Sequence, residues 1–155
     1  MLDDKIVYSE NNYVKKGWSG IGDIFSTESF TGYFGEQKDL IEGGRYRPLS
    51  LASFAVEYAL FKTPGTDKEG NPSMEGNPLV GHLVNILLYG LTGLLLFRIL
   101  YVLFPTAESR PWYLGMAFVG ALLFTLHPVH SEAVANIKGR DEIMALLGSL
   151  GALYY

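Results

Sequence analysis

Residues 79–104 form the stretch that most constrains the fold of this chain. They are almost entirely apolar and include one formally charged side chain, that of Arg98. A helix of this length can cross a hydrocarbon core about 30 Å thick. We therefore predict an all-α polytopic membrane protein whose first visible span covers about 79–104.

Two further apolar segments follow this run. Residues 112–126 carry no charge and reach spanning length when the His127-Pro128 pair is added, so we predict a second span at about 112–128. Residues 143–155 are apolar but fall short of the roughly 17–25 residues that a spanning helix needs. We interpret them as a third span truncated by the end of the sequence, which makes 78–155 a transmembrane region.

The charge is distributed unevenly between the two halves of the chain. Residues 1–77 hold 8 Lys+Arg and 12 Asp+Glu, whereas 78–155 hold 4 of each, so the net charge of -4 lies in the first half. This acidic balance argues against a nucleic-acid partner, which needs clustered basic residues. The lack of cysteine excludes disulfides and thiolate metal sites. Because no signal peptide precedes the acidic half, we expect a missing preceding helix and hence a fragment of a larger protein.

Residues 1–77 are predicted to form a large external loop. Its first part, 1–44, is polar, aromatic and glycine-rich, which indicates an ordered loop with short helical turns. Residues 48–61 give a broad apolar stripe broken by Glu57, which favours an amphipathic helix on the membrane surface. Residues 63–77 contain repeated Pro and Gly and are expected to form a surface loop.

The connection at 105–111 is short, so the first two spans must be antiparallel neighbours. Counting spans then returns 127–142 to the same membrane face as 1–77. The Lys and Arg counts do not settle which face that is, because the charge rule works poorly on long loops.

Residues 127–142 bring two imidazoles, a carboxylate and a guanidinium to the edge of an apolar region, where such groups usually mark a site. His127, His130 and Glu132 have nitrogen and oxygen ligands at a spacing that could bind a metal. Pro128 interrupts the helix between the histidines, and the alternative is a pair of helix-end histidines that hydrogen-bond backbone carbonyls freed by this proline.

Three arginines are candidates for binding an anion: Arg45, Arg47 and Arg140. Arginine makes bidentate contacts with phosphate, and a lipid phosphate would lie at this depth. The alternative is interfacial snorkelling of the long side chains. His82 and Asn85 could line the same cavity or simply bond to neighbouring helices.

The order of these elements resembles that of the transmembrane and tetratricopeptide-repeat-containing O-mannosyltransferases and their bacterial relatives, over nearly the whole chain. The shared pieces are an acidic pair, an aromatic loop segment, an Arg-Pro motif, a His-x-x-Asn motif, a His-Pro-x-His-x-Glu-Ala-Val segment and a Gly-Arg-acid segment. In this sequence they are Asp3-Asp4, Ile24-Phe25-Ser26, Tyr46-Arg47-Pro48-Leu49, His82-Leu83-Val84-Asn85, the run from Leu123 to Val134, and Gly139-Arg140-Asp141-Glu142.

The resemblance implies a glycosyltransferase class C fold and a polyprenyl or dolichyl phosphate sugar as donor. It places Asp3 or Asp4 where the acceptor hydroxyl loses its proton, and it assigns Arg47 and Arg140 to the donor phosphate. Transfer from a lipid phosphate to a hydroxyl needs such a general base and such positive charge.

The same resemblance assigns Glu132 to the catalytic site and His127 and His130 to the donor phosphate, on a second external loop that faces the first. Departures are the acid at Asp4, where Asp or Glu can stand in the wider class, and the insertion-like loop at 63–77. Any helix before Asp3, and any tetratricopeptide repeats, would lie outside this sequence.

The resulting expectation is an integral-membrane transferase of a mannose-like sugar to a hydroxyl acceptor, the Ser or Thr of a protein. The membrane would be the endoplasmic reticulum or the bacterial inner membrane, with the active face lumenal or periplasmic. We expect no cofactor, a divalent metal being conceivable but not indicated, and no activity in this fragment alone. The alternatives are a transporter or channel with a His/Glu proton or metal pathway, and a non-catalytic membrane scaffold.

Overall fold

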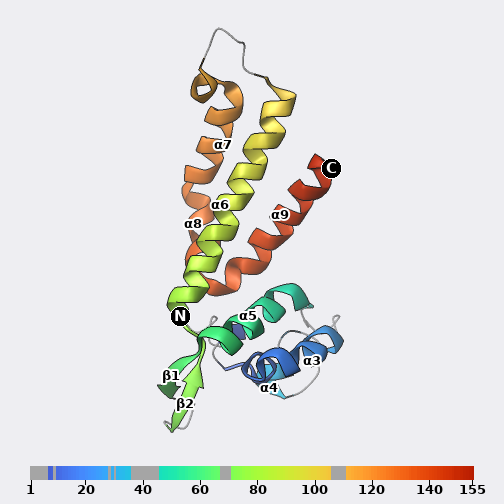
Figure 1. Cartoon of the computed structure of the whole chain (residues 1–155), viewed down its shortest axis with the longest axis vertical. Coiled ribbons are helices and arrows are strands. Elements are labelled where there is room, and N and C mark those ends of the chain that lie inside the picture. Colours follow the sequence, from blue (N-terminus) through green and yellow to red (C-terminus); the bar gives the residue numbers. More distant parts are fainter. Residues whose placement is uncertain are drawn as a thin grey trace. The chain divides into compact units, whose positions relative to one another are not determined.

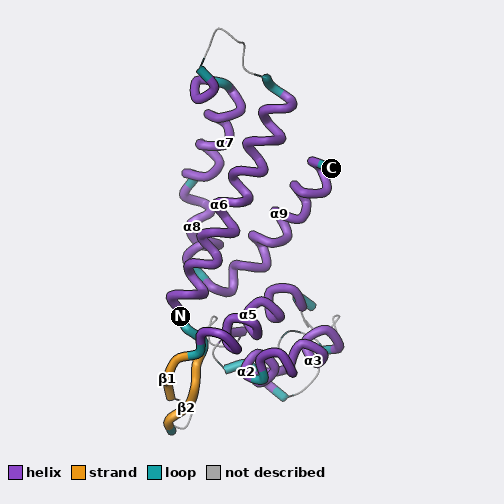
Figure 2. Tube along the Cα trace, viewed as in Figure 1, coloured by secondary structure: helices purple, strands orange, loops and turns teal. Residues whose placement is uncertain are grey.

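The computed structural model describes residues 7–8, 10–27, 29, 31–35, 46–66, 71–105 and 111–155. The chain divides into two compact units, Met1–Leu83 and Val84–Tyr155, and each is described by itself. Apart from one short hairpin, the regular structure of the described residues is helical, as the sequence predicts (Figure 2).

The elements of the first unit are short except for one helix. They are α2 (Asn12–Lys15), the 3-10 helix η2 (Gly17–Gly20), α3 (Ile21–Ser26), α4 (Thr31–Phe34), α5 (Pro48–Phe61), β1 (Thr63–Thr66) and β2 (Pro72–Glu75). The second unit contains most of α6 (Pro78–Leu103), η4 (Trp112–Leu114), α7 (Met116–Leu126), η5 (Pro128–His130), α8 (Ser131–Ala135), η6 (Ile137–Gly139) and α9 (Arg140–Tyr154).

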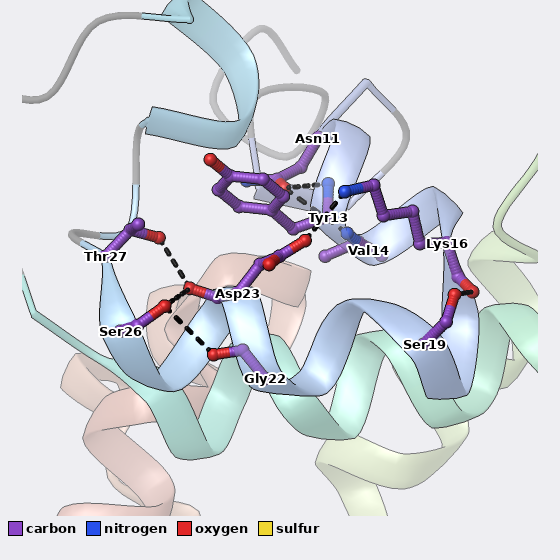
Figure 3. Close-up of polar contacts among 9 residues, drawn as sticks. All are labelled: Asn11, Tyr13, Val14, Lys16, Ser19, Gly22, Asp23, Ser26 and Thr27. Atoms are coloured by element: carbon purple, nitrogen blue, oxygen red, sulfur yellow. Dashed lines mark hydrogen bonds and ion pairs between the residues drawn. The ribbon is translucent and has the colours of Figure 1, made fainter.

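The N-cap of α2 organises the polar part of the first unit. The fully buried Asn11 accepts hydrogen bonds through its Oδ1 from the backbone N–H groups of Tyr13 and Val14 at 3.0 and 3.3 Å. Its Nδ2 donates to the carbonyl of Ser29 at 3.2 Å. Figure 3 shows this cap beside the surface ion pair between Lys16 and Asp23, 2.7 Å apart. One asparagine therefore starts a helix and ties it to a segment 18 residues away.

Helix α5 begins at Pro48, as predicted, because proline has no N–H to satisfy at the first helical position. It packs against α2, η2 and α3 through a buried side that includes Leu51, Phe54 and Ala55. Glu57, which the sequence suggests as a polar break in the stripe, lies on the buried side as well. The predicted short helical turns before α5 are confirmed by α2, η2, α3 and α4.

The predicted surface loop at 63–77 contains a two-stranded antiparallel hairpin, which the sequence analysis missed. Thr63 pairs with Glu75 and Thr66 with Pro72. The Glu75 carboxylate also accepts a hydrogen bond from the N–H of Thr66 at 3.2 Å. The proline and glycine content of this segment therefore concealed its two short strands.

Helices α6 and α7 lie side by side and antiparallel in the second unit (Figure 1). An earlier residue of α6 contacts the end of α7, and a later residue of α6 contacts the start of α7. The Tyr89 hydroxyl reaches the carbonyl of Thr125 at 3.1 Å, and the Phe97 ring meets the Phe118 ring at 6.2 Å between centroids. The antiparallel arrangement predicted from the short connection is confirmed.

Helix α6 is the one helix of the described residues that is both long and apolar enough to cross a membrane. Only 17% of its most apolar stretch is buried, whereas the core helix of a soluble protein is mostly buried. Its exposed surface carries large aliphatic side chains such as Leu87, Leu94 and Val102. Water would be a poor solvent for this surface, and lipid a good one.

The predicted second span at 112–128 is divided in the structure. A 3-10 turn, η4, precedes α7, and α7 stops at Leu126 because Pro128 disfavours helical backbone at the residue before it. His127 accordingly takes φ -68° and ψ 126°. The chain then bends by 46° into the segment Pro128–Ala135, and by length and composition α7 and this segment together match either a broken span or a re-entrant loop. Helix α9 begins at Arg140, three residues before the predicted third span.

Replacing Asn11 by alanine should lower the free energy of unfolding by about 1–3 kcal/mol, because two helix N–H groups and a buried carbonyl lose their partner. Thermal unfolding of the full chain in detergent micelles measures the change. The matched control is Asn12→Ala at the neighbouring exposed position, which should be nearly neutral. Equal losses in the two variants would contradict the role given to the cap.

Candidate functional site

One face of α6 carries Asn85, Tyr89 and Gly93, spaced four residues apart. Residues at this spacing lie one above the other on a helix. All three contact the chain that runs from α7 to α9, so we call them the α6 polar ridge. The ridge faces the segment between α7 and α9, where the helices end and begin again. Backbone carbonyls at these helix ends have no partner within the helix and need one from another segment.

Asn85 and Arg140 form the buried centre of this arrangement. Both side chains are fully buried, and the Arg140 Nε donates to the Asn85 Oδ1 at 2.9 Å. The Asn85 Nδ2 donates to the carbonyl of Asn136 at 2.9 Å, and a longer contact reaches the carbonyl of Ile137 at 3.5 Å. The two carbonyls fix the orientation of the amide, so its oxygen must face the guanidinium. Of the two expectations for Asn85, bonding to neighbouring segments is the one that the structure confirms.

Tyr89 donates a hydrogen bond to the last turn of α7, where the helix ends. Its hydroxyl donates to the carbonyl of Thr125 at 3.1 Å, with that of Phe124 at 3.4 Å. Its ring lies 5.9 Å from the His130 imidazole, which also contacts the Phe124 ring in a tilted arrangement, with 4.3 Å between centroids. His130 therefore contacts one aromatic ring from each helix of the pair.

Gly93 allows α6 and α7 to approach closely. A Cβ atom added to Gly93 would lie 2.5 Å from the Cγ2 of Thr125, too close for any side chain without movement. A second close approach occurs at Gly139, where an added Cβ would lie 2.3 Å from the carbonyl oxygen of Ala133. The first glycine brings the α6 polar ridge within reach of α7, and the second lets η6 fold back on α8.

The structure corrects the expected role of His127. The predicted alternative to a metal site had this imidazole donating to carbonyls freed by Pro128. Instead, its Nδ1 accepts a hydrogen bond from the N–H of Val129 at 3.2 Å and caps η5. The physical reason is that the turn after Pro128 begins a new helical segment, whose first N–H groups need acceptors. Within the described residues, no group of three or more His, Asp or Glu side chains could hold a metal ion.

The two histidines line a shallow cavity of about 340 Å³ with Leu123, Phe124 and Val129. Their rings are 6.1 Å apart between centroids. Glu132 lies in the first turn of α8, and its side chain is exposed. Apolar walls with imidazoles beside them can accept a molecule that has an apolar part and an anionic part.

The remaining predicted site residues belong to the first unit of the chain. Arg47 is the N-cap of α5, and its backbone N–H donates to the Ser29 Oγ at 2.9 Å, which links it to the Asn11 network. Asp3, Asp4 and Arg45 lie outside the described residues. The roles of Arg47, Arg140, Glu132 and the histidines in catalysis or phosphate binding stay predictions.

Tyr89 and Gly93 are the residues that the sequence analysis missed. Their signal was the four-residue spacing from Asn85, which marks one helix face. Single-residue hydropathy hides this signal because tyrosine and glycine are both common in apolar helices.

Asn85→Leu should destabilise the second unit by about 1–3 kcal/mol, because a buried guanidinium and a part-buried carbonyl lose a partner. The change is measured by thermal unfolding of the full chain in detergent. Leu87→Ala, at an exposed position of the same helix, is the control and should cost much less. A stable Asn85→Leu variant would show that the amide does not hold this loop.

The comparisons with known proteins point to one enzyme family. The chain is 34% identical over 108 residues to the protein O-mannosyl-transferase F38B6.6 of Caenorhabditis elegans, covering 70% of this chain and 13% of that protein. It is 38% identical over 102 residues to the protein O-mannosyl-transferase TMTC1 of Mus musculus, covering 66% of this chain and 9% of the relative. With TMTC4 of Homo sapiens it shares 33% identity over 108 residues, again 66% of this chain and 13% of the relative.

The chain thus spans about a tenth of the length of the curated relatives it matches. No protein-family model and no solved structure matches it. The resemblance predicted from the motifs is nevertheless confirmed by these relatives. Over about two thirds of its length, this chain is a homologue of the TMTC-type protein O-mannosyl-transferases.

Proposed function

We propose that this chain is part of a membrane glycosyltransferase that moves a mannose-like sugar from a polyprenyl or dolichyl phosphate to a protein Ser or Thr hydroxyl. The observation that carries the proposal is the similarity to protein O-mannosyl-transferases at 33–38% identity. The part of the relatives that it matches is small, so the activity is proposed for the complete protein, and we expect none from these 155 residues alone.

The geometry of the second unit supports this function. A lipid phosphate has an apolar chain next to a charged group, and the cavity beside His127 and His130 combines apolar walls with imidazoles. Glu132 follows on the next helical turn, where its exposed carboxylate is accessible to a substrate. The α6 polar ridge makes hydrogen bonds to the backbone of the segment that carries these side chains.

The proposed placement in the membrane follows from the helices. Helix α6 and the broken segment from α7 to α8 would be the first two spans, and α9 would begin the third. Helix α5 would lie on the membrane surface, since Leu49, Leu60 and Phe61 remain exposed on it although its other side is packed. The active face would be the lumenal face of the endoplasmic reticulum or the periplasmic face of a bacterial inner membrane.

The proposed chemistry needs a base and a cation. Asp3 or Asp4 would take the proton of the acceptor hydroxyl as the sugar is transferred. Arg47 and the histidines would stabilise the phosphate that leaves, and the fully buried Arg140 would add its positive charge without contacting the phosphate. No cofactor is needed for this reaction scheme.

Asp3→Asn and Glu132→Gln should each reduce sugar transfer by about 10²–10⁴-fold, the range that a positioned acid or base contributes. The experiment supplies a radiolabelled polyprenyl phosphate sugar to membranes that contain the full-length protein, and measures the label transferred to protein. Glu142→Gln is the matched control, an exposed acid in the first turn of α9, and should retain activity.

Membrane insertion and expression of each variant are checked in the same preparation. Loss of transfer in Asp3→Asn and Glu132→Gln with insertion intact supports the proposed site. Wild-type turnover in both variants would contradict the roles, and absence of transfer from every lipid phosphate sugar by the wild-type protein would contradict the function.

A further inference from the structure

The α6–α7 pair has a second surface that plays no part in the proposed transfer reaction. An apolar cavity of about 430 Å³ runs between the two helices and is lined by residues that include Gly90, Leu94, Ala121 and Leu122. Its volume lies in the range of about 300–1,000 Å³ that is typical of ligand pockets. The cavity exists because glycine and alanine leave space where larger side chains would fill it.

This cavity, which we call the apolar groove, leads toward an aromatic cluster. The cluster lies at the end of the helix pair where η4 is found. Trp112 contacts Phe97 at 6.3 Å and Phe118 at 5.1 Å between ring centroids, and all three rings line the groove. Trp112 and the neighbouring Tyr113 are both exposed. Tryptophan and tyrosine concentrate at membrane–water interfaces, so this end of the pair has the composition of an interface.

Among the residues that the structure describes, one positively charged side chain, that of Arg98, lies at the same end. A second cavity, of about 540 Å³, is lined by Phe97, Arg98, Tyr101 and Trp112, and it shares Phe97 and Trp112 with the apolar groove. Arg98 is exposed and makes no hydrogen bond or ion pair with the described residues. It lies five residues before the end of α6, about 7.5 Å along the helix, within reach of an interface for a long side chain.

We propose that this surface binds one anionic phospholipid, with an acyl chain in the groove between α6 and α7 and the head-group phosphate at Arg98. The apolar groove and the Arg98 guanidinium are adjacent, and they match the two chemically different parts of such a lipid. A guanidinium can contact phosphate oxygens through two N–H groups, and the rings of Tyr101 and Trp112 favour the head-group level. The lipid would take no part in the sugar-transfer chemistry, although the groove shares Gly93 and Thr125 with the contact between the α6 polar ridge and α7.

The test uses two photoactivatable lipids in vesicles of phosphatidylcholine that contain the full-length protein. One probe is phosphatidylserine and the other is phosphatidylcholine, both with the same diazirine-bearing acyl chain. We expect the phosphatidylserine probe to label the wild-type protein about fivefold more strongly, the factor that one basic residue near an anionic lipid provides. Labelled peptides should map to the residues of α6 and α7 that line the groove.

Two variants separate the head-group contact from the groove. Arg98→Gln should reduce phosphatidylserine labelling to the level of phosphatidylcholine, and Arg98→Lys should retain part of the preference. Gly90→Leu should reduce labelling by both probes, because an added Cβ at Gly90 meets no atom within 4 Å and the leucine can enter the groove without a clash. Gly148→Leu, at an equally open glycine of α9, is the matched control and should leave labelling unchanged.

Thermal unfolding in detergent confirms that the variants fold. Equal labelling of the wild-type protein by both probes would overturn the proposal, as would a preference that survives in Arg98→Gln. Labelling that maps elsewhere would also overturn it. None of these outcomes depends on whether the protein transfers sugar.

Discussion

The contact on which the second unit depends is the one between the Asn85 amide and the Arg140 guanidinium. Between α7 and α9 the chain interrupts its helix repeatedly, and each interruption leaves carbonyl groups without intrahelical partners. In apolar surroundings such groups need partners from a neighbouring segment. Asn85 supplies them and at the same time accepts a hydrogen bond from a fully buried arginine, so one amide stabilises both the irregular backbone and a buried charge.

This arrangement explains how His130 and Glu132 can lie at the end of the apolar helix pair α6–α7. Pro128 stops α7, and the α6 polar ridge supports the backbone that follows. His130 then contacts the rings of Phe124 and Tyr89, whereas Glu132 stays exposed. A packed side chain and an accessible one are therefore neighbours in the sequence, which suits a site where substrate must meet a positioned group.

The sequence predicted those features that depend on local composition. A long run with one charge gave α6 to within one residue at each end, and Pro48 marked the start of α5. Prediction failed where the outcome depends on contacts between distant residues. Nothing local shows that Asn85 would meet Arg140, 55 positions away, and the uniform apolarity of 112–126 concealed the short turn η4. The motif order nevertheless identified the family, because it depends on residue identity rather than on packing.

The most direct test of this account is a double-mutant cycle between Asn85 and Arg140, with each residue replaced by leucine alone and together. The free energy of unfolding of the full chain in detergent is measured for all four proteins. If the two side chains stabilise each other, the double variant loses less than the sum of the single losses, by about 0.5–3 kcal/mol. Strict additivity would contradict the account, because it would mean that the broken segment is held by other contacts.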